Sequence, residues 1–303
     1  MTPYAIAVLF TLASTALYAL GYALAKLLAE TLHPFEITFL RSALVLASVM
    51  ALTMAKPAPL ATITRIALPA RPWAQRMTGA MLIFSTTLGV IGYWLVPITE
   101  AAALGFTAPV ILAALGAIWL KEEVSARRWI AVLLGFAGML VVVRPGGELF
   151  TWYAAIPIAS ALSYATYQVM ARRIRDVASA EDITTQGALM GVVLLAPAML
   201  VLWQNPDLLT WVLVVIYTLL QTAALLFLAG AVRRAEVSAL APWQYARIAF
   251  ALALDAVMFD RWPGLWALAG CLLSAAPLGE MLRRAQLCAW KTQRAPGPWP
   301  AWR

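Results

Sequence analysis

The charged residues of this chain are confined to short segments that separate long apolar runs. Of its 303 residues, 63% are hydrophobic and 12% are charged, which is more apolar surface than a water-soluble fold can bury. A helix needs about 20 apolar residues to cross the hydrocarbon core of a bilayer. Runs of roughly that length recur at residues 4–27, 35–55, 77–96, 101–120, 129–143, 152–171, 183–203, 211–232, 237–258 and 265–281. The sequence therefore predicts an all-α integral membrane protein with ten transmembrane helices.

The distribution of lysine and arginine predicts how these spans are oriented. The formal net charge is +8, but the basic residues lie in short loops beside spans and not on one continuous face. Nucleic acid is therefore not an expected partner. With the N-terminus in the cytoplasm, 17 of the 22 basic residues fall in cytoplasmic loops or the C-terminal tail. Cytoplasmic loops of membrane proteins carry such an excess, so we expect both termini in the cytoplasm.

The two halves of the chain resemble each other when the sequence is shifted by 146 positions. Tyr18 then aligns with Tyr164, and Glu36 aligns with Asp182. Each half contains five predicted spans, and because five is odd the second half must enter the membrane from the opposite side. The sequence thus predicts two inverted five-helix repeats, residues 1–147 and 148–284, and a cytoplasmic tail, residues 285–303. Inverted repeats around a central site are typical of secondary transporters; a bundle duplicated only for stability is the alternative.

One ionisable side chain lies close to the middle of a predicted span. Arg247 is about ten residues from the inner end of the ninth run, which at 1.5 Å per residue is roughly 15 Å deep. A charge at that depth is unfavourable and marks a functional candidate. Guanidinium binds carboxylate or phosphate through a two-pronged fork, so Arg247 could anchor an anionic solute. The alternative is a structural arginine that pairs with Asp255 or caps carbonyls at a break caused by Pro242.

Aromatic and amide side chains near Arg247 and on other spans could complete a substrate pocket. The predicted substrate-binding residues are Arg247, Gln244, Tyr245, Trp243, Tyr18, Tyr22, Tyr164, Gln168, Tyr93 and Gln221. Tyr18 and Tyr164 occupy matching repeat positions and are expected to face each other. Arg41 lies nearer the end of its span and is interpreted as packing near Glu36 and the outer headgroups.

Catalytic and metal-binding patterns are missing from the sequence. His33 is the only histidine and lies in a predicted outer loop, so histidine metal clusters and conventional Ser-His or Cys-His triads are not expected. No GxxxxGK[ST] phosphate loop occurs. Cys271 and Cys288 are not expected to form a disulfide or to bind a metal. We therefore expect no catalytic residues, no metal and no cofactor.

Two stretches of the first half carry a resemblance to a known family. Residues 99–109 read TEAAALGFTAP and residues 119–123 read WLKEE. This pattern resembles the fourth and fifth spans of the EamA-type drug/metabolite transporters, and ten spans in two halves is that family's plan. The match is weaker in the second half, where residues 243–247 depart from the small-residue pattern. We interpret that departure as a specialised pocket.

The resemblance implies a carrier that moves small organic metabolites across the inner membrane by alternating access. Amino acids or related carboxylate-bearing solutes are the expected substrates, and export or exchange is the expected direction. The partners implied are a small-molecule substrate and the lipid bilayer, with the protein a monomer or homodimer. Two alternatives remain open: a channel-like or non-transporting membrane protein, and a membrane-embedded lipid-modifying enzyme.

Overall fold

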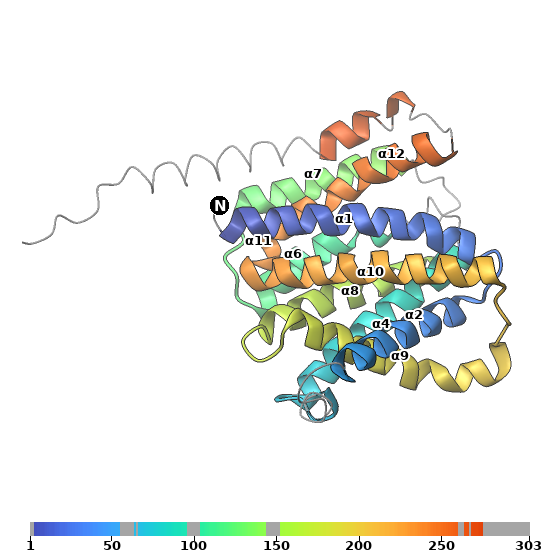
Figure 1. Cartoon of the computed structure of the whole chain (residues 1–303). Helices are drawn as coiled ribbons and strands as arrows, with labels where there is room; N and C mark the ends of the chain where they lie inside the picture. The colour runs from blue at the N-terminus through green and yellow to red at the C-terminus, as the bar shows by residue number, and fades with distance from the viewer. Residues whose placement is uncertain are drawn as a thin grey trace, which may run out of the picture.

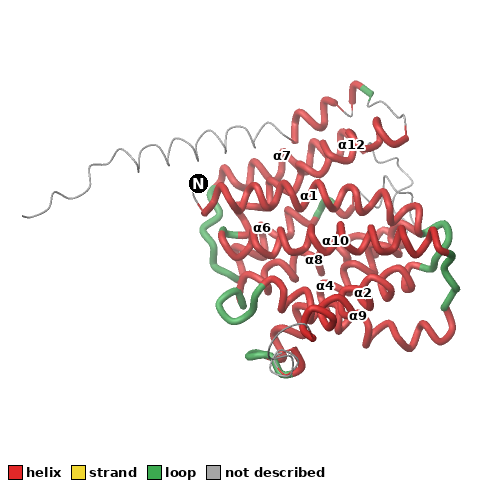
Figure 2. Tube along the Cα trace, in the orientation of Figure 1, coloured by secondary structure: helices red, strands yellow, loops and turns green. Residues whose placement is uncertain are grey.

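The computed structural model of the chain is a bundle of helices. It describes residues 3–54, 64, 66–95, 104–143, 152–259, 264–266 and 268–274. Within these ranges no residue belongs to a β-strand, and the longer helices run side by side (Figure 1, Figure 2). The predicted all-α fold is confirmed. The predicted tail, residues 285–303, lies outside the described residues.

Most described helices coincide with predicted spans. The long ones are α1 Pro3–Leu28, α2 Pro34–Met54, α4 Pro72–Leu95, α7 Ala126–Val143, α8 Ala155–Arg173, α9 Ala180–Leu202 and α10 Leu208–Arg234. The short ones are α6 Ala108–Trp119, the 3-10 helix η1 Trp152–Ala154, α11 Val237–Leu240, the 3-10 helix η2 Ala241–Tyr245 and α12 Ala246–Phe259. The last predicted span is helical at residues 265–266 and 268–274 and is otherwise outside the description.

The prediction of ten apolar spans holds only in part. Four described helices are long and apolar enough to cross a membrane, namely α1, α2, α9 and α10. α8 is long enough but too polar, and α6 has only 12 residues. α8 carries Ser160, Ser163 and Gln168 within its length. Helices surrounded by other helices rather than by lipid can carry such side chains.

The ninth predicted span is a broken helix and not a continuous one. α11 ends at Leu240, the five residues of η2 follow, and α12 continues from Ala246. Pro242 lies in the first turn of η2. Because proline lacks the N–H needed for the α-helical ladder, the break predicted at this residue is confirmed. Discontinuous helices in membranes are tolerated where they are buried in protein or line a cavity.

Helices of the first half pack mainly against helices of the second. α1 lies along α10, α4 along α8 and α2 along α9 (Figure 1). By their order in the predicted repeats, α1 corresponds to α8 and α4 corresponds to α10. The pair α1–α10 therefore maps onto the pair α8–α4 when the halves are exchanged, and α2–α9 maps onto itself. The two halves are interleaved around a shared centre.

Side-chain caps determine where two helices of the second half begin. At the start of α9, Ser179 Oγ accepts a hydrogen bond from the Asp182 amide at 3.0 Å, and Asp182 Oδ2 accepts one from the Ser179 amide at 2.9 Å. At the start of α10, Asp207 Oδ1 accepts from the Thr210 amide at 2.9 Å. Caps of this kind satisfy the first amides of a helix, and a carboxylate also complements its dipole.

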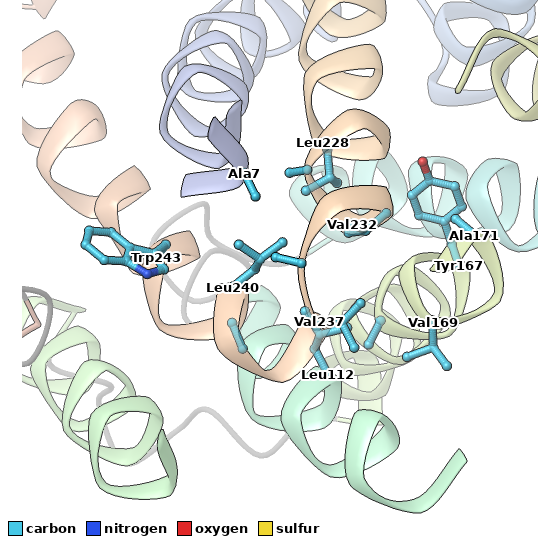
Figure 3. Packing of buried hydrophobic residues seen from close by; sticks show 14 of the residues in the cluster. Ala7, Leu112, Tyr167, Val169, Ala171, Leu228, Val232, Val237, Leu240 and Trp243 are labelled. Atoms are coloured by element: carbon cyan, nitrogen blue, oxygen red, sulfur yellow. The ribbon is translucent and has the colours of Figure 1, made fainter. Parts of the chain in front are cut away.

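The main hydrophobic core lies where α6, α8, α10 and α11 meet. Figure 3 shows part of it, with Val237 and Leu240 of α11 near Leu112 of α6 and Val232 of α10. All four side chains are at most 1% exposed. Burial of a side chain of this kind stabilises the fold by about 1.5–3 kcal/mol. The core thus anchors α11, the short helix that precedes the break.

Candidate functional site

The break between α11 and α12 lets three consecutive side chains reach three different parts of the bundle. Trp243 Nε1 donates to the hydroxyl of Tyr4 on α1 at 3.1 Å. Gln244 Nε2 donates to Gln168 Oε1 on α8 at 2.7 Å. The Tyr245 hydroxyl donates to the carbonyl of Phe106, two residues before α6, at 3.3 Å. All three side chains are 6% exposed or less, so η2 is held in place from several sides.

Tyr245 is also packed tightly against α7. A Cβ atom added to Gly135 would lie 2.3 Å from Tyr245 Cδ2, which is closer than atoms can approach. Only glycine permits this contact between the ring and the helix. Trp243 belongs to the main hydrophobic core and is paired with Tyr4. Among the predicted site residues, Trp243 is thus one that contributes to the packing of η2.

Arg247 lies between two aromatic rings. Its Cζ atom is 4.7 Å from the ring centroid of Phe106 and 5.5 Å from that of Tyr22 on α1. A guanidinium group at such distances is attracted by the negative face of the ring. Ring stacking uses the faces of the guanidinium plane, whereas oxyanions bind along its N–H edge. The expected role of Arg247 in binding an anion stays a prediction.

Four tyrosine rings extend from Arg247 into the bundle, and we call them the tyrosine ladder. Ring centroids are 6.3 Å apart for Tyr22 and Tyr18, 6.2 Å for Tyr18 and Tyr164, and 6.1 Å for Tyr164 and Tyr167. The first two rings belong to α1 and the last two to α8. Tyr18 and Tyr164, the residues at matching repeat positions, are therefore in contact. The ladder offers flat apolar surfaces together with phenolic hydroxyl groups.

Several buried polar atoms beside the ladder lack a hydrogen-bond partner. They are the hydroxyl of Tyr167, Nε2 of Gln168 and Oε1 of Gln221. Gln221 lies on α10 against Gly21 of α1, where an added Cβ would be 2.8 Å from its amide carbon. A buried polar group without a partner destabilises a protein by about 1–3 kcal/mol. These atoms are suited to accept a partner from water or from a bound polar solute.

Arg41 on α2 also belongs to this region, which the sequence interpretation did not expect. Its side chain is 6% exposed, and its Nε has no hydrogen-bond partner. It borders a small cavity together with Leu82 and Leu225, which belong to the same hydrophobic core as Tyr167. Glu36, the partner expected from the sequence, instead accepts from the backbone amide of Gln204 at 3.2 Å. Arg41 is thus directed into the bundle and not toward headgroups.

One aromatic residue of the site was missed by the sequence analysis. Phe106 was not selected, because an aromatic residue in an apolar run gives no signal of its own. Tyr167 is one of the aromatic residues that the sequence suggests could complete the pocket. The side chains of Tyr93 and Asp255 lie outside the description, so the expected roles of these two residues stay predictions.

A second concentration of charge lies at the end of the bundle where α6, α8 and α10 end. Glu122 accepts hydrogen bonds from the amides of Val237 and Ser238 at 3.1 and 3.0 Å, and from the Ser238 hydroxyl at 2.6 Å. Arg128 pairs with Glu236 at 2.5 Å. These contacts connect the α6–α7 turn of the first half to the α10–α11 turn of the second. We call them the loop-end network.

The loop-end network borders an open hollow of about 480 Å³. Its lining residues are Leu120, Lys121, Glu122, Glu123, Arg172, Arg173, Arg175, Asp176 and Glu236. The α6–α7 and α8–α9 turns therefore lie at the same end of the bundle, as alternating spans require. Side chains of both charges line the hollow. No cluster of three or more His, Cys, Asp or Glu side chains suited to a metal ion is found in the described part of the chain.

A helical bundle with apolar spans, a broken helix and a central polar and aromatic cluster defines a membrane transport protein. The sequence model of the EamA-like transporter family matches residues 5–144 and 151–278. The chain belongs to this family, and its function is transport and not catalysis. The alternative of a lipid-modifying enzyme is excluded on this ground.

Individual relatives include transporters of two named solutes. An S-adenosylmethionine uptake transporter of Rickettsia bellii (strain RML369-C) is 23% identical over 250 residues, covering 82% of this chain and 84% of the relative. A riboflavin transporter of Vibrio cholerae serotype O1 is 28% identical over 221 residues, covering 69% and 71%. One protein of known crystal structure matches with a TM-score of 0.73 at 20% identity, covering 92% of this chain and 98% of that one. This last similarity supports the fold.

Proposed function

We propose that the protein carries a small organic metabolite with a carboxylate group across the inner membrane by alternating access. The observation that carries the proposal is the position of Arg247 between Phe106 and Tyr22. A cation held by two rings next to the tyrosine ladder can bind a carboxylate by its N–H edge while the rest of the solute packs on the rings. Amino acids and related compounds have the required group.

The solutes in the names of the relatives both contain a flat heterocycle, and one of the two has a carboxylate. S-Adenosylmethionine, the solute in the name of the rickettsial relative, combines a carboxylate with a flat heterocycle. Riboflavin, the solute in the name of the Vibrio relative, is also built on a flat heterocycle. The tyrosine ladder suits flat rings, because aromatic pairs at centroid distances of about 4.5–7 Å are attractive. The family resemblance favours export or exchange as the direction of transport. An exchange assay in liposomes would also detect uptake.

The packing of the helices supports alternating access by two inverted repeats. The exchange of helix pairs between the halves, α1–α10 for α8–α4, is the pattern that a pseudo-two-fold axis in the membrane plane produces. A metabolite site needs some 300 Å³ or more, whereas the cavity beside Arg41 measures about 10 Å³. The helices around this cavity must therefore part for a solute to enter it.

Transport is tested with the purified full chain in liposomes. Vesicles are preloaded with unlabelled S-adenosylmethionine, riboflavin or single amino acids, and entry of the labelled compound is followed. A carrier shows saturable entry that internal solute accelerates, whereas a channel shows neither. Arg247→Gln is expected to weaken apparent affinity about tenfold or more, since a hydrogen bond to a charged group contributes about 1.5–3 kcal/mol.

The matched control is Arg234→Gln. Arg234 also lies over a ring, 5.0 Å from the centroid of Phe10, but it is at the loop end of α10. Its replacement changes the net charge equally and should leave affinity unchanged. Unchanged affinity in folded Arg247→Gln protein would remove Arg247 from the site. Absence of saturable entry for every carboxylate tested would overturn the proposed function.

The proposed orientation, with both termini in the cytoplasm, is tested by cysteine labelling. Glu123→Cys and Asp176→Cys are introduced singly into protein whose two natural cysteines are replaced by serine. Both positions are exposed and border the same hollow. If the proposed orientation is correct, both introduced cysteines react only with a reagent added on the cytoplasmic side. Labelling of the two positions from opposite sides would contradict the inverted repeats.

A further inference from the structure

The structure assigns a second anion-binding residue to the transport site: we propose that Arg41 binds a second oxyanion of the solute, so that the site prefers solutes with two separated anionic groups. The inference rests on the proposed function and extends it from a carboxylate to a dianion. Its basis is the position of a second arginine beside the tyrosine ladder.

Arg41 is a buried cation whose electrostatic balance is incomplete among the described residues. Its side chain is 6% exposed, and no ion pair to a described carboxylate is present. The only acidic side chain on its own helix, Glu36, is bonded to the Gln204 amide. Removing a charge from water without a counter-charge destabilises a protein by several kcal/mol. An oxyanion at this position would supply the missing counter-charge.

The surroundings of Arg41 can accept a ligand. Its Nε is one of the buried polar atoms without a partner. It borders a cavity of about 10 Å³ together with Ser42 and Thr184, two hydroxyl-bearing residues. That volume is about the minimum for one water molecule. The cavity therefore indicates a polar position that is already partly open, at the junction of α2, α4, α9 and α10.

Arg41 and Arg247 are placed to act on one solute. Arg247 lies over Tyr22 at one end of the ladder. Arg41 borders the same cavity as Leu82 and Leu225, and these two residues belong to the hydrophobic core that also contains Tyr167, at the other end of the ladder. Two guanidinium groups separated by flat apolar rings are complementary to a molecule with a flat apolar middle and an oxyanion at each end. Each end would be bound by a charge-assisted pair of hydrogen bonds.

The experiment uses matched ligands that differ in one charge. Benzene-1,4-dicarboxylate and naphthalene-2,6-dicarboxylate are each compared with their mono-amide, which has the same shape and one carboxylate. Affinities are measured by calorimetric titration of the detergent-purified full chain. We expect at least one dicarboxylate to bind wild type about tenfold more tightly than its mono-amide, as one additional charged hydrogen-bond pair provides. In Arg41→Gln the difference should fall to about twofold or less.

Two further variants separate a binding role from a folding role. Arg41→Lys keeps the charge but loses the planar fork, and it should retain part of the preference. Arg234→Gln serves as the control for a change in net charge and should retain all of it. The melting temperature of each variant without ligand reports its folding. Loss of the preference in Arg41→Gln but not in Arg234→Gln supports the inference.

The outcomes distinguish this inference from the function on which it rests. If the mono-amides bind and Arg247→Gln weakens them, but neither dicarboxylate binds more tightly, Arg41 has no ligand role and the carboxylate site stands. Retention of the dicarboxylate preference in Arg41→Gln leads to the same conclusion. If Arg247→Gln leaves binding of the mono-amides unchanged, the carboxylate site itself is wrong.

Discussion

The centre of the bundle and its loop end both contain buried or half-buried charges, but they satisfy them in opposite ways. In the loop-end network, Glu122 receives three hydrogen bonds and Arg128 is paired with Glu236. Around the tyrosine ladder, the Tyr167 hydroxyl and atoms of Gln168, Gln221 and Arg41 have no partner. The polar groups named in the loop-end network thus have partners within the protein, whereas those around the tyrosine ladder could form further hydrogen bonds.

This difference indicates a division of roles. Polar groups that are fully satisfied by the protein rigidify it, and partly satisfied ones are where a partner is expected. The loop-end network links turns of the two halves, so it should determine stability and the closure of that end. The ladder and its arginines should determine affinity. Substitutions in the two regions are therefore expected to change different measured quantities.

The largest expected effect on stability comes from Glu122→Ala. This change removes the acceptor for the first amides of α11 and for the Ser238 hydroxyl. We expect the free energy of unfolding to fall by about 2 kcal/mol, since hydrogen bonds to a charged group contribute about 1.5–3 kcal/mol and the site is half-buried. Thermal unfolding in detergent measures it.

Glu123→Ala is the control for this prediction. Glu123 is the exposed neighbour, and the contact it makes, from Arg128 to its carbonyl, involves only its backbone. Its replacement should leave the melting temperature unchanged. Equal melting temperatures for Glu122→Ala and wild type would show that the loop-end network does not stabilise the fold.

A smaller loss of stability is expected from Gly135→Ala, at the border of the central region. The added methyl group would overlap the ring of Tyr245, which must move or displace α7. Overpacking in a protein interior destabilises by about 1–3 kcal/mol, and we expect a value near the lower limit because the ring can tilt. At Gly105 an added Cβ meets no atom within 4 Å, so Gly105→Ala should be neutral. Equal effects of the two changes would contradict the close contact.

The ion pair of Arg128 and Glu236 should contribute less. Their side chains are 27% and 43% exposed, and pairs accessible to water contribute about 0–1 kcal/mol. A double-mutant cycle with Arg128→Gln and Glu236→Gln measures the coupling between them. We expect a coupling below about 1 kcal/mol that weakens as salt is added. A coupling that is insensitive to salt would show that the pair is effectively buried.

The smallest effect concerns Asp207, at the opposite end of α10 from the loop-end network. Hydrogen bonds from the side chain and backbone of Thr210 lower the pKa of the Asp207 carboxyl below its ordinary value. The contribution to stability is therefore fully present above about pH 4 and is lost as the pH falls through the lowered pKa. Melting temperatures recorded from pH 6 to pH 3 should fall less steeply in Asp207→Asn than in wild type. Identical slopes would exclude this contribution.

The sequence predicts those features of the structure that are determined by residues close to each other along the chain. The positions of most helices and the break at Pro242 follow from apolar runs and from the missing N–H of proline, so they were predicted within a few residues. The contact of Tyr18 with Tyr164 followed from the repeat. The burial of Arg41 could not be predicted, because it depends on α4, α9 and α10 packing around α2.

The contact of Trp243 with Tyr4 could not be predicted for the same reason. Trp243 is four positions from Arg247 and would be its neighbour on a regular helix. It lies in the 3-10 helix η2, where its Nε1 donates to the Tyr4 hydroxyl, and its role in the pocket stays a prediction. Spacing along the sequence predicts contacts only where the helix continues, and a broken helix is where a transport site is expected.

The most direct test of the division of roles combines two measurements on two variants. The solute identified by exchange in liposomes is titrated into wild type, Arg247→Gln and Glu122→Ala, and the melting temperature of each protein is recorded without solute. Our account predicts that Arg247→Gln binds about tenfold or more weakly with an unchanged melting temperature, and that Glu122→Ala melts lower with unchanged affinity. A lower melting temperature together with wild-type affinity in Arg247→Gln would contradict it.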